Sequence, residues 1–384
     1  MKKQFLFLTA ALLMAGAVSC NKPQEAPAPD APLQTLNLRI GIPDEETKVV
    51  ANTTNVKDFR INSVQVFVFN DPAGQGGSSA KLETDYYYAP ASPAEGSISV
   101  TLNTTSNQKT IYVVANRARM YRTRGTYSMA DFEAELTDLT ENSLTGLLMA
   151  GKVQADVDPE NIPQDVYVFL KRLVCMVKLT NLKVDFGNSS LSGATFTLKG
   201  MYLKNAVGRA RMALSGYTDT DGTDACFLSL STADHNNGNY WYNKHTRTND
   251  SPALLVDDGC NDACSTGGTA TAIGRCLFAY PNQTLADMDS HSSSATWVPR
   301  LTRITLKAHV SKNANGVSVD EDTFYTFDLP ELEANKVYDI RNIHITQMGK
   351  ADDNSDSNVQ GGQIMPTVTV DEWDSDVVNL NYEF

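Results

Sequence analysis

Beyond residue 33, apolar residues recur mostly at every second position or in short runs bounded by Asn, Gly, Asp and Pro. Leu36–Ile42 alternates regularly, and Val64–Phe69 is an apolar segment followed by a Gly-rich turn. Alternation is typical of half-buried strands, because successive side chains point to opposite faces of a sheet. Further strands are predicted over Ser97–Leu102, Thr110–Ala115, Val166–Leu170, Leu173–Leu179, Thr195–Leu203, Arg275–Tyr280, Leu301–Val310, Thr323–Leu329, Val337–Thr346 and Met365–Val370. Short spacing without intervening helices predicts an all-β fold of antiparallel β-sandwiches.

One short helix is expected over Ser128–Leu139, where Ser128 can cap the first turn together with Glu133. Apolar residues recur there at helical spacing and would share one face. This face consists of Met129, Phe132, Leu136 and Leu139.

A domain boundary is predicted at Lys171–Arg172, shortly after an Asp- and Pro-rich stretch. It divides the chain into a smaller N-terminal β-sandwich domain, residues 34–172, and a larger C-terminal one, residues 173–384. Within the second domain, residues 216–268 are poor in strand pattern and rich in Asp, Asn, Thr and Gly. Such composition indicates long inserted surface loops.

The charge balance excludes one large class of function. The 384 residues include 32 Lys plus Arg against 45 Asp plus Glu, a formal net charge of −13. Without the first 19 residues, which hold two lysines, the charge becomes −15. An acidic chain of this kind has no electrostatic attraction for DNA or RNA, so nucleic acid is not an expected partner.

The N-terminus has the pattern of an export signal. Two lysines precede an apolar run over residues 5–18, too short to span a bilayer, and small residues stand directly before Cys20. This pattern predicts a signal peptide, residues 1–19, and acylation of Cys20 as in bacterial lipoproteins; the alternative is an ordinary signal peptide with an incidental cysteine. Residues 20–33 are Pro-rich and read as an extended tether.

The remaining five cysteines suggest one local disulfide. Cys175 and Cys276 lie in apolar strands and read as small buried hydrophobes. Cys226, Cys260 and Cys264 lie in the inserted loops, where an exported protein can form a disulfide, and Cys260–Cys264 is the first candidate. An odd number leaves at least one thiol unpaired within the chain.

No catalytic or cofactor motif is present in the sequence. The five histidines are scattered and lack the tight spacing of zinc ligands, so no metal and no cofactor are expected. The adjacent acids Asp371 and Glu372 read as a solvated strand end rather than as glycosidase carboxylates. We therefore expect no enzyme activity and assign no catalytic residues.

A set of segments, in order along the chain, carries a family resemblance. They are the lipoprotein signal and tether, Ile61–Asn70, Thr110–Asn116, Gly146–Gly151, Val168–Val177, Phe278–Asn282, Asn335–Ile340 and Val368–Trp373. Together they resemble the fimbrillin family, the major fimbrial subunits or type V pilins of Gram-negative anaerobes. No single segment is specific, whereas the ordered set covers most of the chain.

The resemblance implies two β-sandwich domains of transthyretin-like or immunoglobulin-like Greek-key type and a role as a structural subunit of a surface fimbria in adhesion and colonisation. It also implies a lipid-anchored precursor at the cell outer membrane, held there through Cys20. An Arg/Lys-specific protease then removes the first strand, and another subunit donates a strand into the groove. Expected partners are therefore other copies of this chain, accessory fimbrial subunits and the maturation protease, with a host glycan or protein as a further ligand.

Both ends of the chain fit strand exchange. The first strand, expected at a removable sheet edge, offers Leu36, Leu38, Ile40 and Ile42 on one face. The tail, residues 374–384, offers Val378, Leu380, Tyr382 and Phe384 at the same spacing. Burying such side chains contributes about 1.5–3 kcal/mol each, or roughly 6–12 kcal/mol for four, before ordering costs. The alternative is that the tail is the last strand of its own domain.

The proteolytic cut is expected in the polar loop after the first strand. Lys48–Val49 is the first candidate bond there, with Lys57 and Arg60 as later choices. Arg39 lies within the strand and should be protected. The alternative is that Lys48 is only a charged surface residue of this loop. The family that the chain resembles usually has arginine at the cleavage position.

Two other functions remain open from the sequence. The Cys-containing insertion and the lysine at the cut leave room for an accessory adhesin at the tip or anchor of a fimbria. A surface lipoprotein that binds or cleaves glycans without polymerising is the other alternative. Three adjacent aromatics, Tyr240–Tyr242, suit sugar stacking but equally suit a clamp that packs on the domain.

Overall fold

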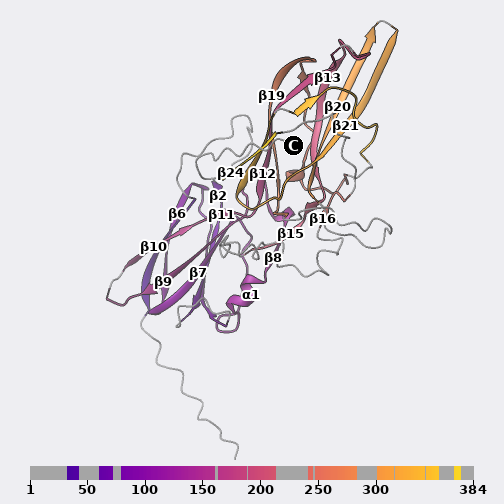
Figure 1. Cartoon of the computed structure of the whole chain (residues 1–384). Helices are drawn as coiled ribbons and strands as arrows, with labels where there is room; N and C mark the ends of the chain where they lie inside the picture. The colour runs from indigo at the N-terminus through magenta and orange to yellow at the C-terminus, as the bar shows by residue number, and fades with distance from the viewer. Residues whose placement is uncertain are drawn as a thin grey trace, which may run out of the picture.

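The computed structural model describes residues 33–42, 60–71, 79–160, 163–187, 189–212, 241–244, 247–282, 301–314, 316–341 and 343–353, and the backbone of 367–372. Its elements are β1 Gln34–Gly41, β2 Arg60–Ile61, β3 Val64–Asn70, β4 Lys81–Tyr88, β5 Ala94–Glu95, β6 Ser97–Thr104, β7 Asn107–Ala115, α1 Met129–Glu133, β8 Leu136–Asp138, η1 Leu139–Glu141, β9 Met149–Val157, β10 Gln164–Phe169, β11 Lys171–Arg172, β12 Cys175–Asp185, β13 Thr195–Lys204, β14 Ala206–Val207, β15 Arg209–Arg211, β16 Trp241–Tyr242, η4 Ala253–Leu255, β17 Val256–Asp257, β18 Asp262–Cys264, β19 Gly267–Ala279, β20 Arg303–Ala314, β21 Val317–Asp328, β22 Lys336–Arg341, β23 Ile343–Ile345 and β24 Thr367–Glu372. The expected all-β class is confirmed (Figure 1).

Most of the strands up to β11 form the N-terminal sandwich of two sheets; β2 pairs with β5, and β8 pairs with β15. A three-stranded sheet in the order β10-β1-β6, which we call the slot sheet, faces a five-stranded sheet in the order β11-β9-β7-β3-β4. Side chains from the inner faces of both sheets form one buried apolar cluster. This packing buries the period-two faces that the sequence shows, as a two-layer sandwich requires.

Aromatic side chains cover the other face of the five-stranded sheet. The Phe132 ring of α1 lies 5.0 Å from the Phe67 ring and 4.5 Å from the Tyr112 ring, measured between centroids. Such rings bury large apolar areas and favour tilted contacts at these distances. The five-stranded sheet is thus buried on both faces, which explains why β3 is almost continuously apolar.

The helix is shorter than the sequence predicts. Ser128 does cap it, but its partner in the capping box is Asp131, and the helix ends at Glu133. The expected second half is instead β8, which pairs with β15 of the C-terminal part of the chain. Hydrogen bonds to this distant strand replace those that a longer helix would make.

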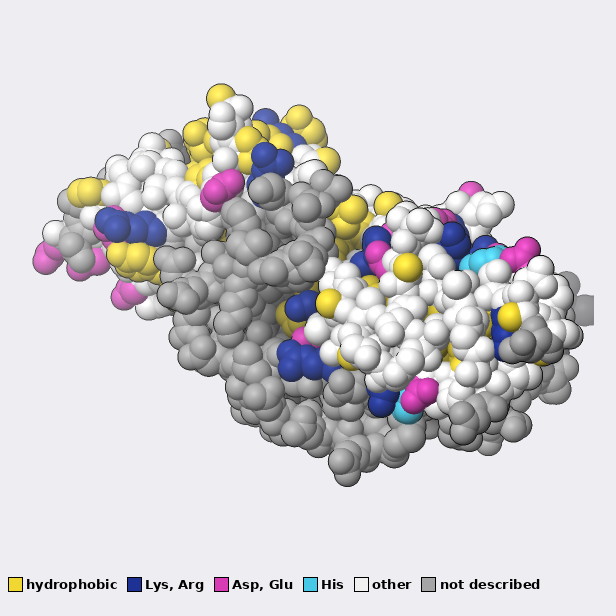
Figure 2. All heavy atoms as spheres, turned by 90° about the horizontal axis from the view of Figure 1, so that it is seen from above, with side chains coloured by type: hydrophobic (Ala, Val, Ile, Leu, Met, Phe, Trp, Pro, Cys, Tyr) yellow, Lys and Arg dark blue, Asp and Glu magenta, His cyan; other side chains and the backbone are white. Residues whose placement is uncertain are grey.

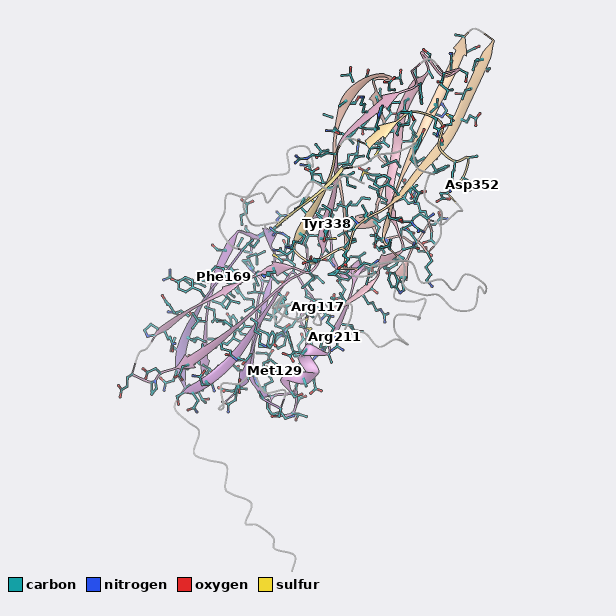
Figure 3. The ribbon with its side chains drawn as sticks, viewed as in Figure 1. Arg117, Met129, Phe169, Arg211, Tyr338 and Asp352 are labelled. Atoms are coloured by element: carbon teal, nitrogen blue, oxygen red, sulfur yellow. The ribbon has the colours of Figure 1, made fainter. Side chains whose placement is uncertain are left out.

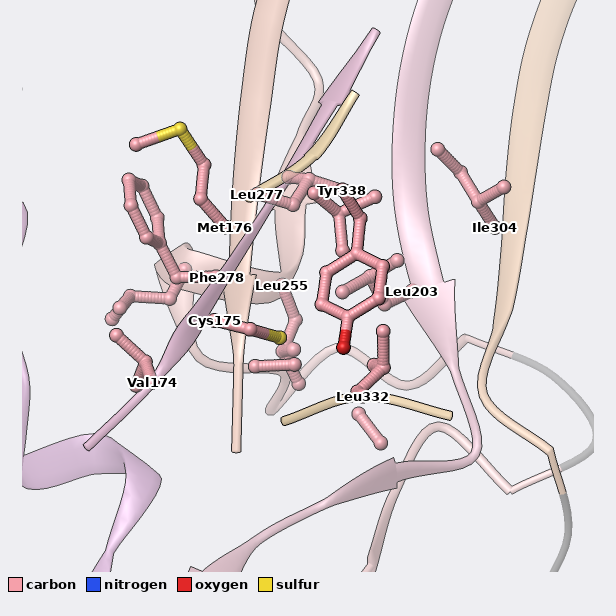
Figure 4. Packing of buried hydrophobic residues seen from close by; sticks show 14 of the residues in the cluster. Val174, Cys175, Met176, Leu203, Leu255, Leu277, Phe278, Ile304, Leu332 and Tyr338 are labelled. Atoms are coloured by element: carbon pink, nitrogen blue, oxygen red, sulfur yellow. The ribbon is translucent and has the colours of Figure 1, made fainter. Parts of the chain in front are cut away.

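The C-terminal domain, from β12 onward, is a second sandwich. One sheet has the order β19-β12-β22-β24 with β23 also paired to β12, and the other has the order β17-β13-β20-β21 with β18 paired to β13. Figure 4 shows the apolar core between them, where the Tyr338 ring lies among Cys175, Leu203 and Leu332. The expected boundary at residues 172/173 stays a prediction; β11 pairs with β9, and β12 pairs with β19.

The two domains share a continuous core and polar links. The buried cluster under α1 runs on into the core of the C-terminal domain. The Tyr280 hydroxyl donates to the Asp138 carbonyl at 3.1 Å and accepts from Asn142 Nδ2 at 3.0 Å. Figure 3 shows Arg117 and Arg211 at this junction, and Arg117 Nη1 lies 2.9 Å from Met212 Sδ.

Two details differ from expectation. The sandwiches are not purely antiparallel, because β1 pairs with β10 in parallel and β12 pairs in parallel with β22 and β23. Part of the expected loop region, residues 216–268, is packed structure: it contains η4, β17 and β18, and Leu254 and Leu255 are buried. Residues 216–240, 245 and 246 of this region lie outside the described residues.

Candidate functional site

The candidate site is the position of β1 in the slot sheet. β1 pairs antiparallel with β6, where Leu36 lies opposite Leu102, and parallel with β10, where Leu36 lies opposite Gln164. It is therefore the central strand of its sheet, so the expectation of an edge position is wrong. We use the term slot for the space between β6 and β10 that β1 fills.

The inner face of β1 is apolar and almost completely buried. Leu36 and Leu38 are 0 % exposed, Ile40 is 1 % exposed, and Ile42, which directly follows β1, is 6 % exposed. They contact the core of the N-terminal domain, so the predicted alternation of the first strand is confirmed. Without these four side chains, the apolar floor of the slot would be open to water.

The outer face of β1 carries a polar network that spans the slot sheet. Thr101 Oγ1 donates to Asn37 Oδ1 at 3.0 Å, and Asn37 Nδ2 donates to Asp165 Oδ1 at 3.2 Å. Arg39 Nη2 donates to the other Asp165 oxygen at 2.9 Å and lies over the Tyr167 ring at 5.5 Å. Asp165 thus accepts from two β1 side chains, a role that the sequence did not indicate.

Strand β10, which borders the slot, packs closely against β9. Gly151 of β9 lies against β10: a Cβ at this position would stand 2.4 Å from the Phe169 carbonyl oxygen and 2.9 Å from Val168 Cγ1. Only glycine permits this approach of the two strands. The Phe169 side chain points away from the sandwich and is 61 % exposed (Figure 3).

A buried ion pair lies near the start of β1, where Gln34 is opposite Thr104. Lys109 Nζ donates to Glu83 Oε2 at 2.5 Å, and Thr104 and the Thr105 N–H donate to Glu83 Oε1 at 2.8 and 2.6 Å. Burial raises the pKa of Glu83, but the hydrogen bonds from Lys109, Thr105 and Thr104 outweigh it and leave the pKa below its usual value.

The ion pair borders an open cavity of about 440 Å³ between β4 and β6, two strands that end their sheets. Lys109 stands among polar residues before the apolar run of β7, so its sequence position did not indicate that it is buried.

Several predicted site residues lie outside the described part of the chain. They are Cys20, Lys48, Val49, Val378, Leu380, Tyr382 and Phe384. The last described strand before the tail is β24, which pairs with β22 at the end of its sheet. Acylation, cleavage and strand donation at these residues therefore stay predictions.

The expected disulfide is not present. Cys260 and Cys264 are both free thiols, as is Cys175. Cys264 ends β18, which pairs with β13, and the Cys260 and Cys264 thiols each contact a backbone carbonyl, at 3.4 and 3.5 Å. Cys226 lies outside the described residues.

The aromatic segment considered for sugar stacking packs on the protein. Trp241 is 5 % exposed and belongs to the core cluster, and the Tyr242 hydroxyl donates to Asp138 Oδ1 at 3.0 Å. Tyr240 lies outside the described residues. Of the two readings, the structure supports the clamp for Trp241 and Tyr242.

Within the described ranges, no group of three or more His, Cys, Asp or Glu side chains is arranged to hold a metal ion. Among the same residues, no helix is long and apolar enough to cross a membrane. The described surface in Figure 2 is largely polar, with hydrophobic side chains in separate clusters.

Comparisons with known proteins agree with this architecture. Residues 35–169 match the family model described as major fimbrial subunit protein (FimA). A putative cell adhesion protein from Bacteroides eggerthii is similar in structure, with a TM-score of 0.52, 18 % identity, and coverage of 89 % of this chain and 97 % of that one.

Two further solved structures are similar at low sequence identity. For a putative cell adhesion protein from Parabacteroides distasonis, the TM-score is 0.53, the identity 15 % and the coverage 89 % of this chain and 100 % of that one. For a fimbrilin from Porphyromonas gingivalis, the values are 0.50, 14 %, 88 % and 96 %. These likenesses establish the fold. No curated protein matches the sequence significantly.

Proposed function

We propose that this chain is a structural subunit of a surface fimbria that polymerises by strand exchange, because residues 35–169 match the family model of the major fimbrial subunit protein (FimA). The family consists of fimbrial structural proteins and not of enzymes. The observation that carries the mechanism is the place of β1: an N-terminal strand that fills a slot between two other strands.

The central place of β1 makes its release harder than that of the edge strand we expected, because two ladders of hydrogen bonds must break, and a strand with no way out would exclude the exchange. The same place gives a donated strand two ladders to form. Loss of β1 would leave unpaired N–H and C=O groups on both β6 and β10, above an uncovered apolar floor. A donated strand would regain both sets of hydrogen bonds and cover the core, as in donor-strand complementation. The slot should therefore bind most favourably a strand that, like β1, has apolar residues at every second position.

Release of β1 would follow a cut in the segment that joins it to β2. Among the described strands, β1 is joined to the rest of the domain through this segment, so a cut at Lys48–Val49 would leave non-covalent contacts to hold it in the slot. Arg39 is an unfavourable target, although its side chain is 56 % exposed, because its backbone is paired on both sides. We retain Lys48–Val49 as the proposed bond.

The tail is the proposed donor, and the slot favours one direction and register for it. When Val378–Phe384 is laid over Leu36–Ile42 in the same direction, Asn379 takes the place of Asn37 between Thr101 and Asp165. Glu383 then takes the place of Gly41, away from Asp165.

The competing placements are unfavourable. Insertion in the opposite direction puts Glu383 in the place of Asn37, beside Asp165. Insertion in the same direction but shifted by two residues toward the start of β1 puts Glu383 in the place of Arg39, again beside Asp165. Like charges opposed across strands are destabilising. A slip of two residues the other way puts Asp376 in the place of Leu36, which is completely buried.

Acylation at Cys20 would hold the precursor on the outer membrane before this exchange. Acyl chains contribute about 0.8 kcal/mol per buried CH₂, so a multiply acylated cysteine is a durable anchor. The Pro-rich tether would hold the domains away from the bilayer. Donation from one copy into the slot of the next is head-to-tail, which generates an open filament.

The test uses the purified chain without its signal peptide, treated with a Lys-specific protease and followed by electron microscopy. The wild-type chain should form filaments after cutting, with a new N-terminus at Val49. Deletion of Val378–Phe384 should leave a folded monomer, and a Lys57→Gln variant should still assemble. Filaments formed by the deletion variant would refute the tail as donor, and assembly without loss of β1 would refute the exchange.

A further inference from the structure

The loop between β7 and α1 is rich in arginine although the chain as a whole is acidic. Its four arginines, Arg117, Arg119, Arg122 and Arg124, fall within eight residues. Three of them form ion pairs, with Glu141 at 2.7 Å, Glu135 at 2.5 Å and Asp85 at 3.6 Å respectively.

Arg119 differs from these three. Among the described residues its guanidinium has neither a carboxylate partner nor a hydrogen-bond acceptor. It lies instead 4.8 Å from the centre of the Tyr121 ring and 5.9 Å from the centre of the Tyr87 ring. Tyr121 is 76 % exposed, so the group is open to solvent. Contacts with the rings orient the cation while its N–H donors stay available.

Strand β3 fixes the position of this loop through hydrogen bonds. Gln65 of β3 is 2 % exposed, and its amide bonds the Met120 backbone twice: Nε2 donates to the carbonyl at 2.7 Å, and the Met120 N–H donates to Oε1 at 2.8 Å. The Met120 side chain is buried as well. Arg119 and Tyr121 flank this fixed peptide, so a ligand would not have to order the loop.

We propose that Tyr87, Arg119 and Tyr121 form a binding site for carboxylate-bearing saccharides on the fimbrial surface. The guanidinium edge fits one carboxylate through two parallel N–H···O bonds, and the exposed Tyr121 ring offers a face for the C–H groups of a sugar ring. An acidic peptide would need several free cations, whereas the neighbouring arginines are already paired. The site is independent of the slot and of polymerisation.

The experiment measures binding of the uncut, monomeric chain to 3′-sialyllactose and to a hyaluronan tetrasaccharide, with lactose as the neutral reference and a hexaglutamate peptide as the acidic-peptide probe. Titration is followed by ligand-detected NMR. At least one acidic saccharide should bind about tenfold or more tightly than lactose, consistent with a charge-assisted bidentate contact.

Variants separate this site from general charge attraction. Arg119→Ala should abolish the preference over lactose and Tyr121→Ala should weaken binding, whereas the matched control Arg124→Ala, on the same loop, should stay within about twofold of wild type. Unchanged melting curves would show that each variant is folded. Equal affinity for lactose and both acidic saccharides, equal loss in Arg119→Ala and Arg124→Ala, or tighter binding of hexaglutamate would each overturn the proposal.

Discussion

Replacement of Leu38 by alanine tests the central place of β1 most directly. Leu38 is completely buried and lies opposite Val100 of β6 and Val166 of β10, which are themselves buried. Truncation of leucine at such a site removes apolar contacts and leaves a cavity, at a cost of about 2–5 kcal/mol. Because about 1.4 kcal/mol corresponds to tenfold, local opening of β1 should rise roughly 30-fold to several-thousand-fold.

Hydrogen exchange followed by mass spectrometry suits this measurement, because it reports on the β1 peptide itself. Tryptophan fluorescence would not, since all three Trp lie at position 241 or beyond. The matched control is Leu380→Ala in the tail. In the uncut chain the control should leave the protection of β1 unchanged, because the tail is not expected in the slot of its own molecule.

In filaments the two variants should exchange roles, with Leu380→Ala weakening the joint and Leu38→Ala leaving it intact. Unchanged β1 protection in Leu38→Ala would contradict its place in the core. Filaments destabilised by Leu38→Ala and not by Leu380→Ala would show that β1 stays in the slot after assembly.

Two substitutions near the slot and one labelling experiment in the C-terminal domain give further predictions. Glu83→Gln should destabilise the uncut chain by up to about 3–5 kcal/mol in urea near neutral pH, because it leaves the buried Lys109 charge unpaired. Since the folded-state pKa of Glu83 is lowered, this advantage of wild type is present above the usual carboxyl pKa of about 4.3 and should shrink as the pH falls through the folded-state pKa; a difference that grows in acid would contradict the pairing. Gly151→Ala should lower the melting temperature and β10 protection, because its Cβ would meet the Phe169 carbonyl, and an unchanged melting curve would argue against the close approach. Burial raises the pKa of Cys175 to about 12, so iodoacetamide at pH 8 should leave this thiol unlabelled until urea unfolds the chain, and rapid native labelling would refute its burial.

The alternation of apolar and polar residues predicted where most strands lie, but not which strands pair with one another. The alternation of Leu36–Ile42 identified β1 and its buried face correctly. Alternation, however, says nothing about which strands lie beside it, and the parallel partner β10 lies more than 120 residues further along the chain. The central place of β1 therefore could not be read from its own sequence.

The same limit explains the helix. Leu136 and Leu139 continue the helical spacing, yet β8 forms because β15, about 70 residues further on, supplies backbone partners. β4 and β9 were missed because their polar and aromatic residues obscure the alternation. The arginines of the loop after β7 were visible in the sequence, but only the structure distinguishes the paired ones from Arg119.

For the proposed exchange, a central strand changes the order of events. An edge strand can fray from one side, whereas β1 must break two ladders and expose four buried side chains before it leaves. Cutting the loop after β1 removes the covalent link but none of these contacts, so the cut subunit should stay folded. A donor that enters from one end can replace each pair as it breaks, and the exposed floor is then never large. Assembly in this scheme is controlled by the arrival of a matching tail, and the outward Asp165 helps to decide which tail matches.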